Sequence, residues 1–323
     1  MSDLDNNNAS GRQGQEPIVE RLVFAALREQ TRARRWRIGF MLFFIVYLSA
    51  VTLMFIFSDN GSSMVGGKAD GDKHTALIKL SGVIASGEAA GAETMIAGLK
   101  SAFEHSDTAG IVLEINSPGG SPVQSAYIFD EIMRLKQSHS DIPVYAVVTD
   151  IAASGAYFVA AAADKIYVNK SSLVGSIGVR MDSFGFVELM KKLGVERRLL
   201  IAGKNKALFD PFLPEQQAQK EHLQSMLGEV HEHFIDAVKQ GRGERLGNDE
   251  ALFSGLIWSG EKALSLGLVD GYGTSRSVSR ELEAENIVDF TPKRDLLERI
   301  AERIGSSAGE QIRQSLLGGY SIH

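Results

Sequence analysis

The chain has 323 residues, seven histidines, no cysteine and a formal net charge of −6. This length fits one or two domains. The lack of cysteine excludes thiol catalysis, disulfides and thiolate metal sites, and the acidic balance argues against nucleic acid as a partner.

The N-terminal region predicts a membrane anchor. Residues 1–37 are polar at first and end in a basic cluster that includes Arg35 and Arg37. Residues 38–57 contain no charged side chain, and twenty such residues cross a hydrocarbon layer of ~30 Å as a helix. Because the arginines precede this stretch, the positive-inside rule places residues 1–37 in the cytoplasm and the rest of the chain outside the membrane.

Beyond a glycine-rich linker at 58–74, apolar segments of strand and helix type alternate over residues 75–284. This alternation predicts one α/β domain built from parallel βα units. The expected strands are Ala76–Ile84, Gly110–Ile115, Pro143–Thr149, Lys165–Asn169, Val174–Val179 and Arg197–Ala202. The expected helices are Glu88–His105, Pro122–Gln137 and Pro214–Gln240. Residues 285–323 are expected to hold a short amphipathic helix at Lys293–Ile304 and a tail.

Ser154 lies where the predicted strand Pro143–Thr149 gives way to an alanine-rich run. Its neighbours are small, and the N–H of Gly155 stands at the start of a helix, where free amides favour negative charge. These features suit a nucleophile with an adjacent anion site. The alternative is that Ser154 only caps the helix.

A second glycine turn, Gly119-Gly120, follows the strand Gly110–Ile115. Neighbouring parallel strands end at the same edge of a sheet, so both turns are expected to point N–H groups at one oxygen. Such a pair of donors is what a tetrahedral oxyanion needs. The alternative is an ordinary turn.

The general base is harder to identify. Three histidines, His222, His231 and His233, are interpreted as the solvated face of the long helix. A lysine base needs a pKa lowered from ~10.4 to about 7–8, which burial in an apolar site supplies. Lys204 and Lys206 follow a predicted strand among apolar residues, although both also fit a solvated loop. Ser259 and Lys262 have a Ser-x-x-Lys spacing, but we interpret Ser259 as a helix cap.

Five motifs occur together in order across about residues 76–275. They are Asn116-Ser117-Pro118-Gly119-Gly120, Ala153-Ser154-Gly155-Ala156-Tyr157, Val174-Gly175-Ser176-Ile177-Gly178-Val179, Gly203-x-x-Lys206 and Trp258-Ser259-Gly260-x-x-Ala263-x-x-x-Gly267-Leu268-Val269-Asp270. With them the chain resembles the signal peptide peptidase SppA group, membrane-bound serine proteases of peptidase family S49, in its short single-domain form. The resemblance implies a Clp/crotonase-like parallel-sheet spiral of ββα-type units.

The resemblance also implies the chemistry. Ser154 matches the nucleophile of a Ser–Lys dyad, Lys206 its general base, and Ser176 a serine that hydrogen-bonds the lysine. The oxyanion donors would be Gly155 with Gly119 or Gly120, and Lys204 ranks second to Lys206 as base. The implied substrates are signal peptide remnants and other apolar peptides. They would be cut without ATP, metal or cofactor on the periplasmic, outer side of the cytoplasmic (inner) membrane.

Short members of the family imply homo-oligomers in which neighbouring protomers complete each site. We therefore expect Ser154 Oγ and Lys206 Nζ to lie beyond hydrogen-bond reach within one chain. Two alternatives from other classes are a crotonase-like acyl-CoA enzyme, which normally needs an acidic acid/base, and a catalytically silent membrane-anchored scaffold.

Overall fold

The computed structural model describes residues 35–50 and 73–292, which belong to two separate units, Met1–Gly67 and Lys68–His323. Residues 35–50 form a helix with exposed apolar side chains. Within the described ranges, no helix has both the length and the apolar character needed to cross a membrane. The predicted span 38–57 continues past this helix, and its residues 51–57 lie outside the described residues, as does the predicted helix Lys293–Ile304.

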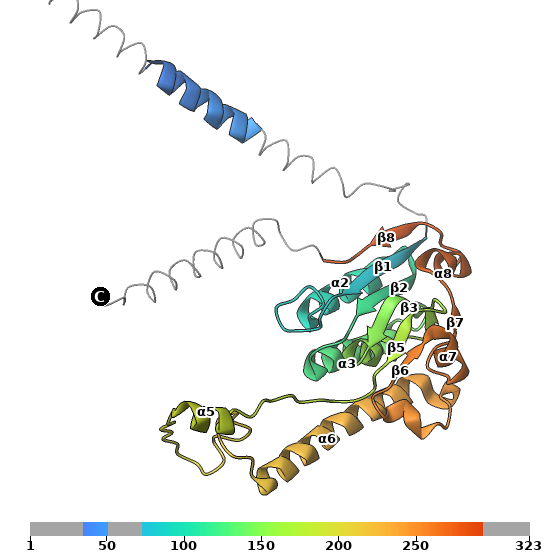
Figure 1. Cartoon of the computed structure of the whole chain (residues 1–323). Helices are drawn as coiled ribbons and strands as arrows, with labels where there is room; N and C mark the ends of the chain where they lie inside the picture. The colour runs from blue at the N-terminus through green and yellow to red at the C-terminus, as the bar shows by residue number, and fades with distance from the viewer. Residues whose placement is uncertain (1–34, 51–72, 293–323) are drawn as a thin grey trace, which may run out of the picture. The chain divides into compact units, whose positions relative to one another are not determined.

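The second unit is built on one eight-stranded sheet with the order β6-β5-β3-β2-β1-β8, in which β4 pairs with both β3 and β7 (Figure 1). All strand pairs are parallel except β5 with β6. The strands are β1 (His74–Ser81), β2 (Thr108–Ser117), β3 (Val144–Ala153), β4 (Lys165–Val168), β5 (Leu173–Gly175), β6 (Ile257–Ser259), β7 (Gly271–Tyr272) and β8 (Ile287–Asp289). The observed fold is therefore α/β with a predominantly parallel sheet, as the sequence predicts.

Helices cover both faces of this sheet. They are α2 (Ala92–Glu104), α3 (Pro122–Ser138), α4 (Gly155–Ala160), α5 (Val187–Leu193), α6 (Gln217–Arg242), α7 (Gly260–Ser265) and α8 (Ser275–Glu281), with short 3-10 turns at Gly243–Arg245 and Glu250–Phe253. The main core joins the sheet to α2, α3, α4 and the last turns of α6. A smaller cluster, which includes Val112 and Val147, packs beneath Val278 of α8. Strands buried on both faces explain the nearly continuous apolar runs of β2 and β3.

Strand β3 changes partner halfway along its length. Its first half pairs with β4, whereas Ile151, Ala152 and Ala153 pair with β5. At the change the register with β2 shifts, and the buried Ser172 donates its hydroxyl to the carbonyl oxygen of Thr149 at 2.5 Å. This change of partner places the end of β5 directly beside the residues that follow β3.

Most predicted elements form within a few residues of their expected bounds, but one strand was wrong. Residues 197–202 form no strand; they belong to an exposed loop in which Leu200 is 98% accessible. A short apolar run forms a strand only where a sheet edge is available for pairing, and this loop pairs with no strand. The sheet also continues past residue 284, because β8 pairs with β1.

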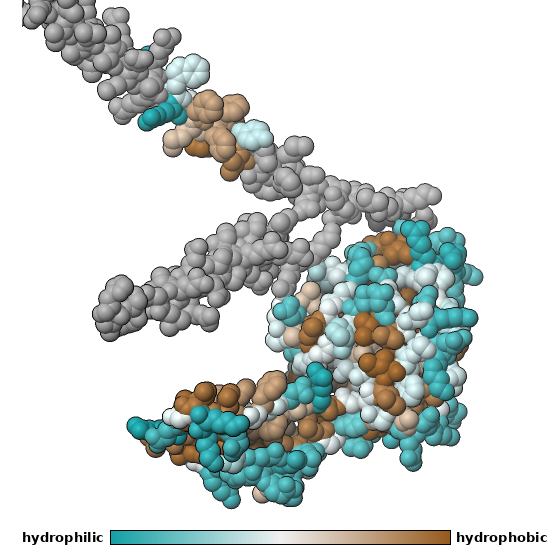
Figure 2. Space-filling view, viewed as in Figure 1, coloured by the Kyte–Doolittle hydropathy of each residue, from teal (hydrophilic) through white to brown (hydrophobic). Residues whose placement is uncertain are grey.

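Residues 178–222, which we call the arm, project from the sheet and contain α5 and the first turns of α6 (Figure 1). Helix α6 has 26 residues and is therefore about 39 Å long. Most of its buried side chains lie in its last third, where it meets the sheet domain. Large apolar side chains remain exposed on the arm, among them Phe184 and Leu193 (Figure 2).

Candidate active site

Ser154 adopts an unusual backbone conformation between β3 and α4, with φ 53° and ψ −126°. Its side chain makes no capping hydrogen bond, so the interpretation of Ser154 as a helix cap was wrong. The main-chain oxygen instead accepts from Tyr157 N at 2.9 Å and from Phe158 N at 3.0 Å. A residue other than glycine in this region carries strain of about 1–3 kcal/mol, and such strain is concentrated at functional sites.

The Gly119-Gly120 turn packs against the backbone of Ser154. A Cβ atom on Gly119 would lie 2.7 Å from Gly155 N and 2.9 Å from Ser154 Cβ. One on Gly120 would lie 2.1 Å from the carbonyl oxygen of Ile84. Both glycines also have positive φ angles, 95° and 156°, so the close approach of the two turns requires glycine at these positions.

The two glycines of this turn differ in their hydrogen bonds. The N–H of Gly119 donates to the buried Ser117 Oγ at 3.1 Å. The N–H groups of Gly120 and Gly155 donate to no other group in the part of the chain that the structure describes. They lie close together, since a Cβ on Gly155 would stand 3.3 Å from Gly120 N. The geometry therefore favours Gly120 with Gly155 as anion-binding donors and gives Gly119 the role of a close-packed spacer.

Ser176 lies next to this arrangement. The N–H of Ser154 donates to the carbonyl oxygen of Gly175 at 2.8 Å, which brings the start of the Ser176 turn alongside the nucleophile candidate. Ser176 also has a positive φ, 53°, and its N–H donates to Leu256 O at 2.7 Å. Neither serine hydroxyl makes a hydrogen bond within residues 73–292.

Lys206 is not part of this cluster. It lies in the arm, in the loop before α6, where its side chain is exposed and its N–H donates to Gly203 O at 3.0 Å. Helix α6 contacts the residue after Ser176 through His231, whose Nε2 lies 3.1 Å from the carbonyl oxygen of Ile177. Between His231 and the start of α6 at Gln217 lie about 20 Å of helix. The structure thus brings together Ser154, Ser176, Gly120 and Gly155, and leaves both Lys204 and Lys206 outside.

The contact of His231 corrects its interpretation as part of a solvated helix face, because its ring is half-buried against residue 177. His222 and His233 are exposed. Ser259 acts as expected: its Oγ accepts from Lys262 N at 3.3 Å and caps α7, which confirms the cap interpretation.

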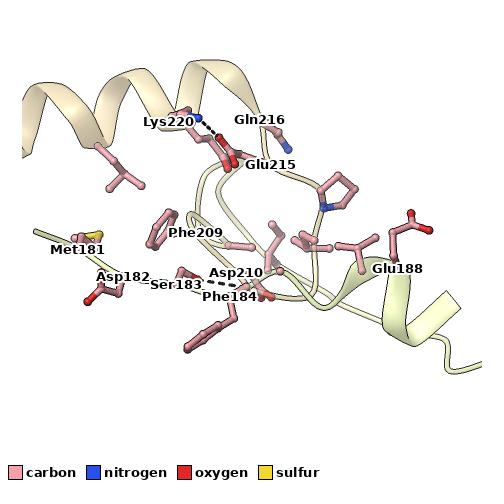
Figure 3. A pocket seen from close by; sticks show the side chains of 18 of the residues that line it. Met181, Asp182, Ser183, Phe184, Glu188, Phe209, Asp210, Glu215, Gln216 and Lys220 are labelled. Atoms are coloured by element: carbon pink, nitrogen blue, oxygen red, sulfur yellow. Dashed lines mark hydrogen bonds and ion pairs between the residues drawn. The ribbon is translucent and has the colours of Figure 1, made fainter. Parts of the chain in front are cut away.

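A hollow of about 1000 Å³ lies in the arm, between the loops around α5 and the start of α6 (Figure 3). Phe186 stacks on Phe212 with ring centroids 5.5 Å apart, and Arg197 pairs with Asp210 beside them. Hydrogen bonds from Arg197 hold the pKa of Asp210 below its ordinary value. The hollow is lined by Lys204 but by neither Lys206 nor Ser154, so it is not the site of chemistry within one chain.

A strained serine with an unpaired hydroxyl, beside two free backbone amides at the edge of a parallel sheet, is the arrangement typical of a serine hydrolase. The family model "Peptidase family S49" matches residues 136–289, and the model "Clp protease" matches residues 74–173. The chain belongs to peptidase family S49, within the Clp/crotonase-like superfamily.

Two of the named relatives carry protease or peptidase names. A Synechocystis protein, "Putative protease slr0021", is 33% identical over 62% of this chain and 70% of its own length. An Enterococcus faecium "Putative signal peptide peptidase SppA" is 31% identical over 67% of this chain and 65% of its length. A Brucella abortus protein named "Na(+)/H(+) antiporter NhaA" is 46% identical over 65% of this chain, and the match spans only 29% of that protein.

Proposed function

We propose that the chain is a membrane-anchored serine endopeptidase with a Ser–Lys dyad, which degrades signal peptide remnants and other apolar peptides without ATP. The observation that carries the proposal is Ser154, strained and unpaired, beside the free N–H groups of Gly120 and Gly155. The name of the Enterococcus faecium relative supports the substrate class.

In the proposed reaction Ser154 Oγ attacks the scissile carbonyl carbon, and its proton passes to the neutral Nζ of Lys206. The negative charge that forms on the carbonyl oxygen is stabilised by the N–H groups of Gly120 and Gly155. The protonated Lys206 then gives the proton to the leaving amine. Water hydrolyses the resulting acyl-enzyme, with Lys206 again as base. Ser176 accepts a hydrogen bond from the lysine and orients it.

The base reaches Ser154 from a neighbouring copy of the chain. Within one chain Lys206 is exposed, whereas a lysine that acts as a base near neutral pH needs an apolar, desolvated setting. The arm carries Lys206 together with exposed apolar side chains such as Phe184 and Leu193. Docking of this arm on the next protomer would bury the apolar surface and remove water from around the lysine at the same time. A repeated head-to-tail contact of this kind closes a ring.

The proposal includes a single-pass anchor at residues 38–57, with the peptidase domain on the outer side of the cytoplasmic membrane. Its support is the uncharged run of twenty residues and the arginines that precede it. An anchor of this kind keeps the site close to apolar peptides left in the membrane. The proposed fold detail is a Clp/crotonase-like spiral of ββα units, supported by the partner change along β3.

The test compares three single variants of the full chain in detergent, Ser154→Ala, Lys206→Ala and Lys204→Ala, on a fluorogenic apolar peptide. We expect the first two to lose at least about 10³-fold in kcat, as removal of a nucleophile or its base does in other serine peptidases. Lys204→Ala is the matched control from the same loop and should stay within about threefold of wild type. A labelled fluorophosphonate should modify Ser154.

Near-normal turnover by Lys206→Ala would refute the dyad. Absence of an adduct on Ser154 in the assembled protein would instead favour a catalytically silent scaffold.

A further inference from the structure

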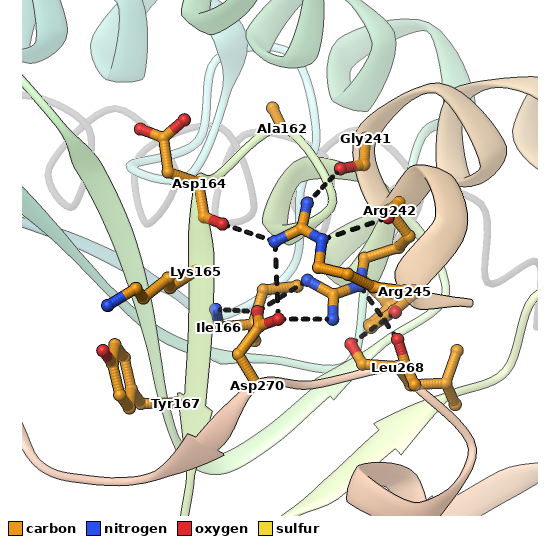
Figure 4. A network of polar contacts seen from close by, with 12 residues as sticks. Ala162, Asp164, Lys165, Ile166, Tyr167, Gly241, Arg242, Arg245, Leu268 and Asp270 are labelled. Atoms are coloured by element: carbon orange, nitrogen blue, oxygen red, sulfur yellow. Dashed lines mark hydrogen bonds and ion pairs between the residues drawn. The ribbon is translucent and has the colours of Figure 1, made fainter. Parts of the chain in front are cut away.

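A buried ion pair fixes the end of α6 that meets the sheet domain (Figure 4). Arg242, in the last turn of α6, has a side chain with no exposed surface. Its Nη1 and Nη2 donate to the two carboxylate oxygens of Asp270 at 2.7 and 2.9 Å, and its Nε donates to Gly267 O at 3.0 Å. All three guanidinium nitrogens are therefore bound in one fixed geometry.

The partner groups of Arg242 are themselves held in place. The carboxylate of Asp270 also accepts from the N–H of Ile166, in β4, at 2.7 Å. Burial alone would raise the pKa of Asp270. The hydrogen bonds and charge of Arg242, together with the N–H of Ile166 and the charge of Arg245, outweigh burial and keep this pKa below its ordinary value. Arg245 donates to the carbonyl oxygens of Gly241 and Arg242, at 2.6 and 3.0 Å, and so binds the C-terminal end of α6.

The same cluster contacts the helix that follows the nucleophile. Tyr157 lies three residues after Ser154 in α4 and donates its hydroxyl to Leu268 O at 2.7 Å, in the loop that leads to Asp270. Gly241 of α6 is so close to Ala161 that a Cβ atom there would lie 1.9 Å from the alanine carbonyl oxygen. One set of polar contacts thus joins α4, which begins at the site, to α6, which carries the arm.

Besides the contact of His231 with Ile177 O, α6 packs on the domain through apolar contacts, such as Phe234 stacked on Phe158 at 4.9 Å. Apolar contacts are non-directional, so they allow a helix to tilt or slide, whereas a bidentate Arg–carboxylate pair fixes orientation. The stretch of α6 from His231 back to its first residue, Gln217, is about 20 Å long. A tilt of the helix by about 5° therefore moves the Gln217 end by about 2 Å. A misplacement of about 1 Å in catalytic geometry is enough to cost about 10²-fold in rate.

We infer that Arg242 and Asp270 are positioning residues for catalysis: their ion pair sets the direction of α6 and so delivers Lys206 to Ser154 of the next protomer. The inference rests on the proposed function, since it takes Lys206 as the base. The side chain of Arg242 has no exposed surface and that of Asp270 little, so both act through the position of α6.

The test is Arg242→Lys, which keeps the charge but removes the planar fork. The matched control is Arg134→Lys, since Arg134 makes the same two-pronged contact with Glu131, at 2.8 Å for both bonds, on α3 away from the arm. Because the chain has no cysteine, Ala202→Cys in the arm and Ser101→Cys in α2 give a clean pair of spin-label sites. Labelled chains are assembled with an excess of unlabelled chains, so the measured distance is within one chain.

We expect Arg242→Lys to broaden or shift this distance distribution, to lower kcat at least tenfold and to leave KM within threefold of wild type. Arg134→Lys should change none of these quantities. If Arg242→Lys does not fold, Asp270→Asn serves in its place, because the amide keeps the shape of the side chain but breaks the charged two-pronged contact with Arg242. It should give the same pattern.

An unchanged distance distribution, an unchanged kcat, or an equal loss in Arg134→Lys would overturn the inference. Failure of the proposed function looks different: Lys206→Ala would then remain active, whatever the distance measurement shows.

Discussion

Backbone strain is concentrated at the two candidate serines. Ser154 and Ser176 account for two of the four non-glycine residues with positive φ in the described ranges, the others being Phe209 and Glu283. Each costs about 1–3 kcal/mol, a sizeable part of a total stability of about 5–15 kcal/mol. Backbone hydrogen bonds of 2.8 and 2.7 Å from the two serine N–H groups hold the strained turns together.

We expect Gly155→Ala to lose activity because the added methyl group overlaps a neighbouring side chain, and not because the backbone conformation at residue 155 requires glycine. Gly155 has an ordinary φ, but an added Cβ would lie 2.4 Å from Ser125 Oγ. The overlap displaces the Gly155 amide from the oxyanion position, and loss of one such donor costs about 10²–10³ in kcat. Steady-state kinetics on the fluorogenic peptide measures the effect.

The double variant Gly155→Ala/Ser125→Ala provides the control. Without the hydroxyl, the nearest atom of residue 125 is its Cβ at 3.5 Å, which is an ordinary contact. We expect at least tenfold recovery of kcat over the single variant. No recovery would show that the rate depends on something other than this overlap.

The sequence singled out Ser154, Ser176 and the two glycine turns, which the structure brings together, but it did not distinguish the two turn glycines. The sequence leaves Gly119 and Gly120 as equal candidates for the second oxyanion donor. The structure distinguishes the two glycines, because the N–H of Gly119 already donates a hydrogen bond to Ser117 Oγ at 3.1 Å. That preference depends on the three-dimensional path of a turn, which motif spacing does not encode.

Elements that bury an apolar face followed their sequence patterns closely. Helix α3 begins at Pro122, as predicted, because Ser121 caps it and proline suits the first turn. The arm did not follow its pattern, since Leu199 and Leu200 belong to an apolar run of strand type that pairs with no strand in one chain. The Arg242–Asp270 pair was also missed: Asp270 was recognised only as part of a motif, and its partner lies 28 positions away.

The start of β1 gives a pH-dependent prediction at this scale. His74 is buried, stands 4.8 Å from His105 edge to face and stacks on Phe290. Burial lowers the pKa of His74 and the nearby His105 lowers it further, against the opposite effect of Asp107. Between the unfolded value of ~6.5 and the lower folded value, the unfolded chain binds more protons. The free energy of unfolding should therefore fall as pH drops below about 6.5.

Urea unfolding of the full chain at pH 7.5 and 5.5 measures this loss. His74→Phe should lose less stability than wild type between these two pH values, whereas the exposed His222→Phe should behave as wild type. An equal loss in wild type and His74→Phe would remove His74 as the cause.

For the whole molecule, the decisive question is whether one site uses two chains. Ser154→Ala and Lys206→Ala are each expected to be inactive alone. In oligomers assembled from equal amounts of both, about a quarter of the sites should combine an intact serine with an intact neighbouring lysine in a head-to-tail ring. Co-refolding the two variants and measuring peptide cleavage tests this directly. Activity that stays at background would place both groups within one chain.

If each site takes its serine from one chain and its lysine from the next, the separation of Lys206 from Ser154 within one chain also controls when activity begins. A newly made chain carries a nucleophile without a base, so it is in effect its own zymogen, although no pro-segment needs to be cleaved. Hydrolysis would then begin only when copies meet, and its onset would depend on their concentration. A sparse population would spare other proteins, and a dense one would clear peptides quickly.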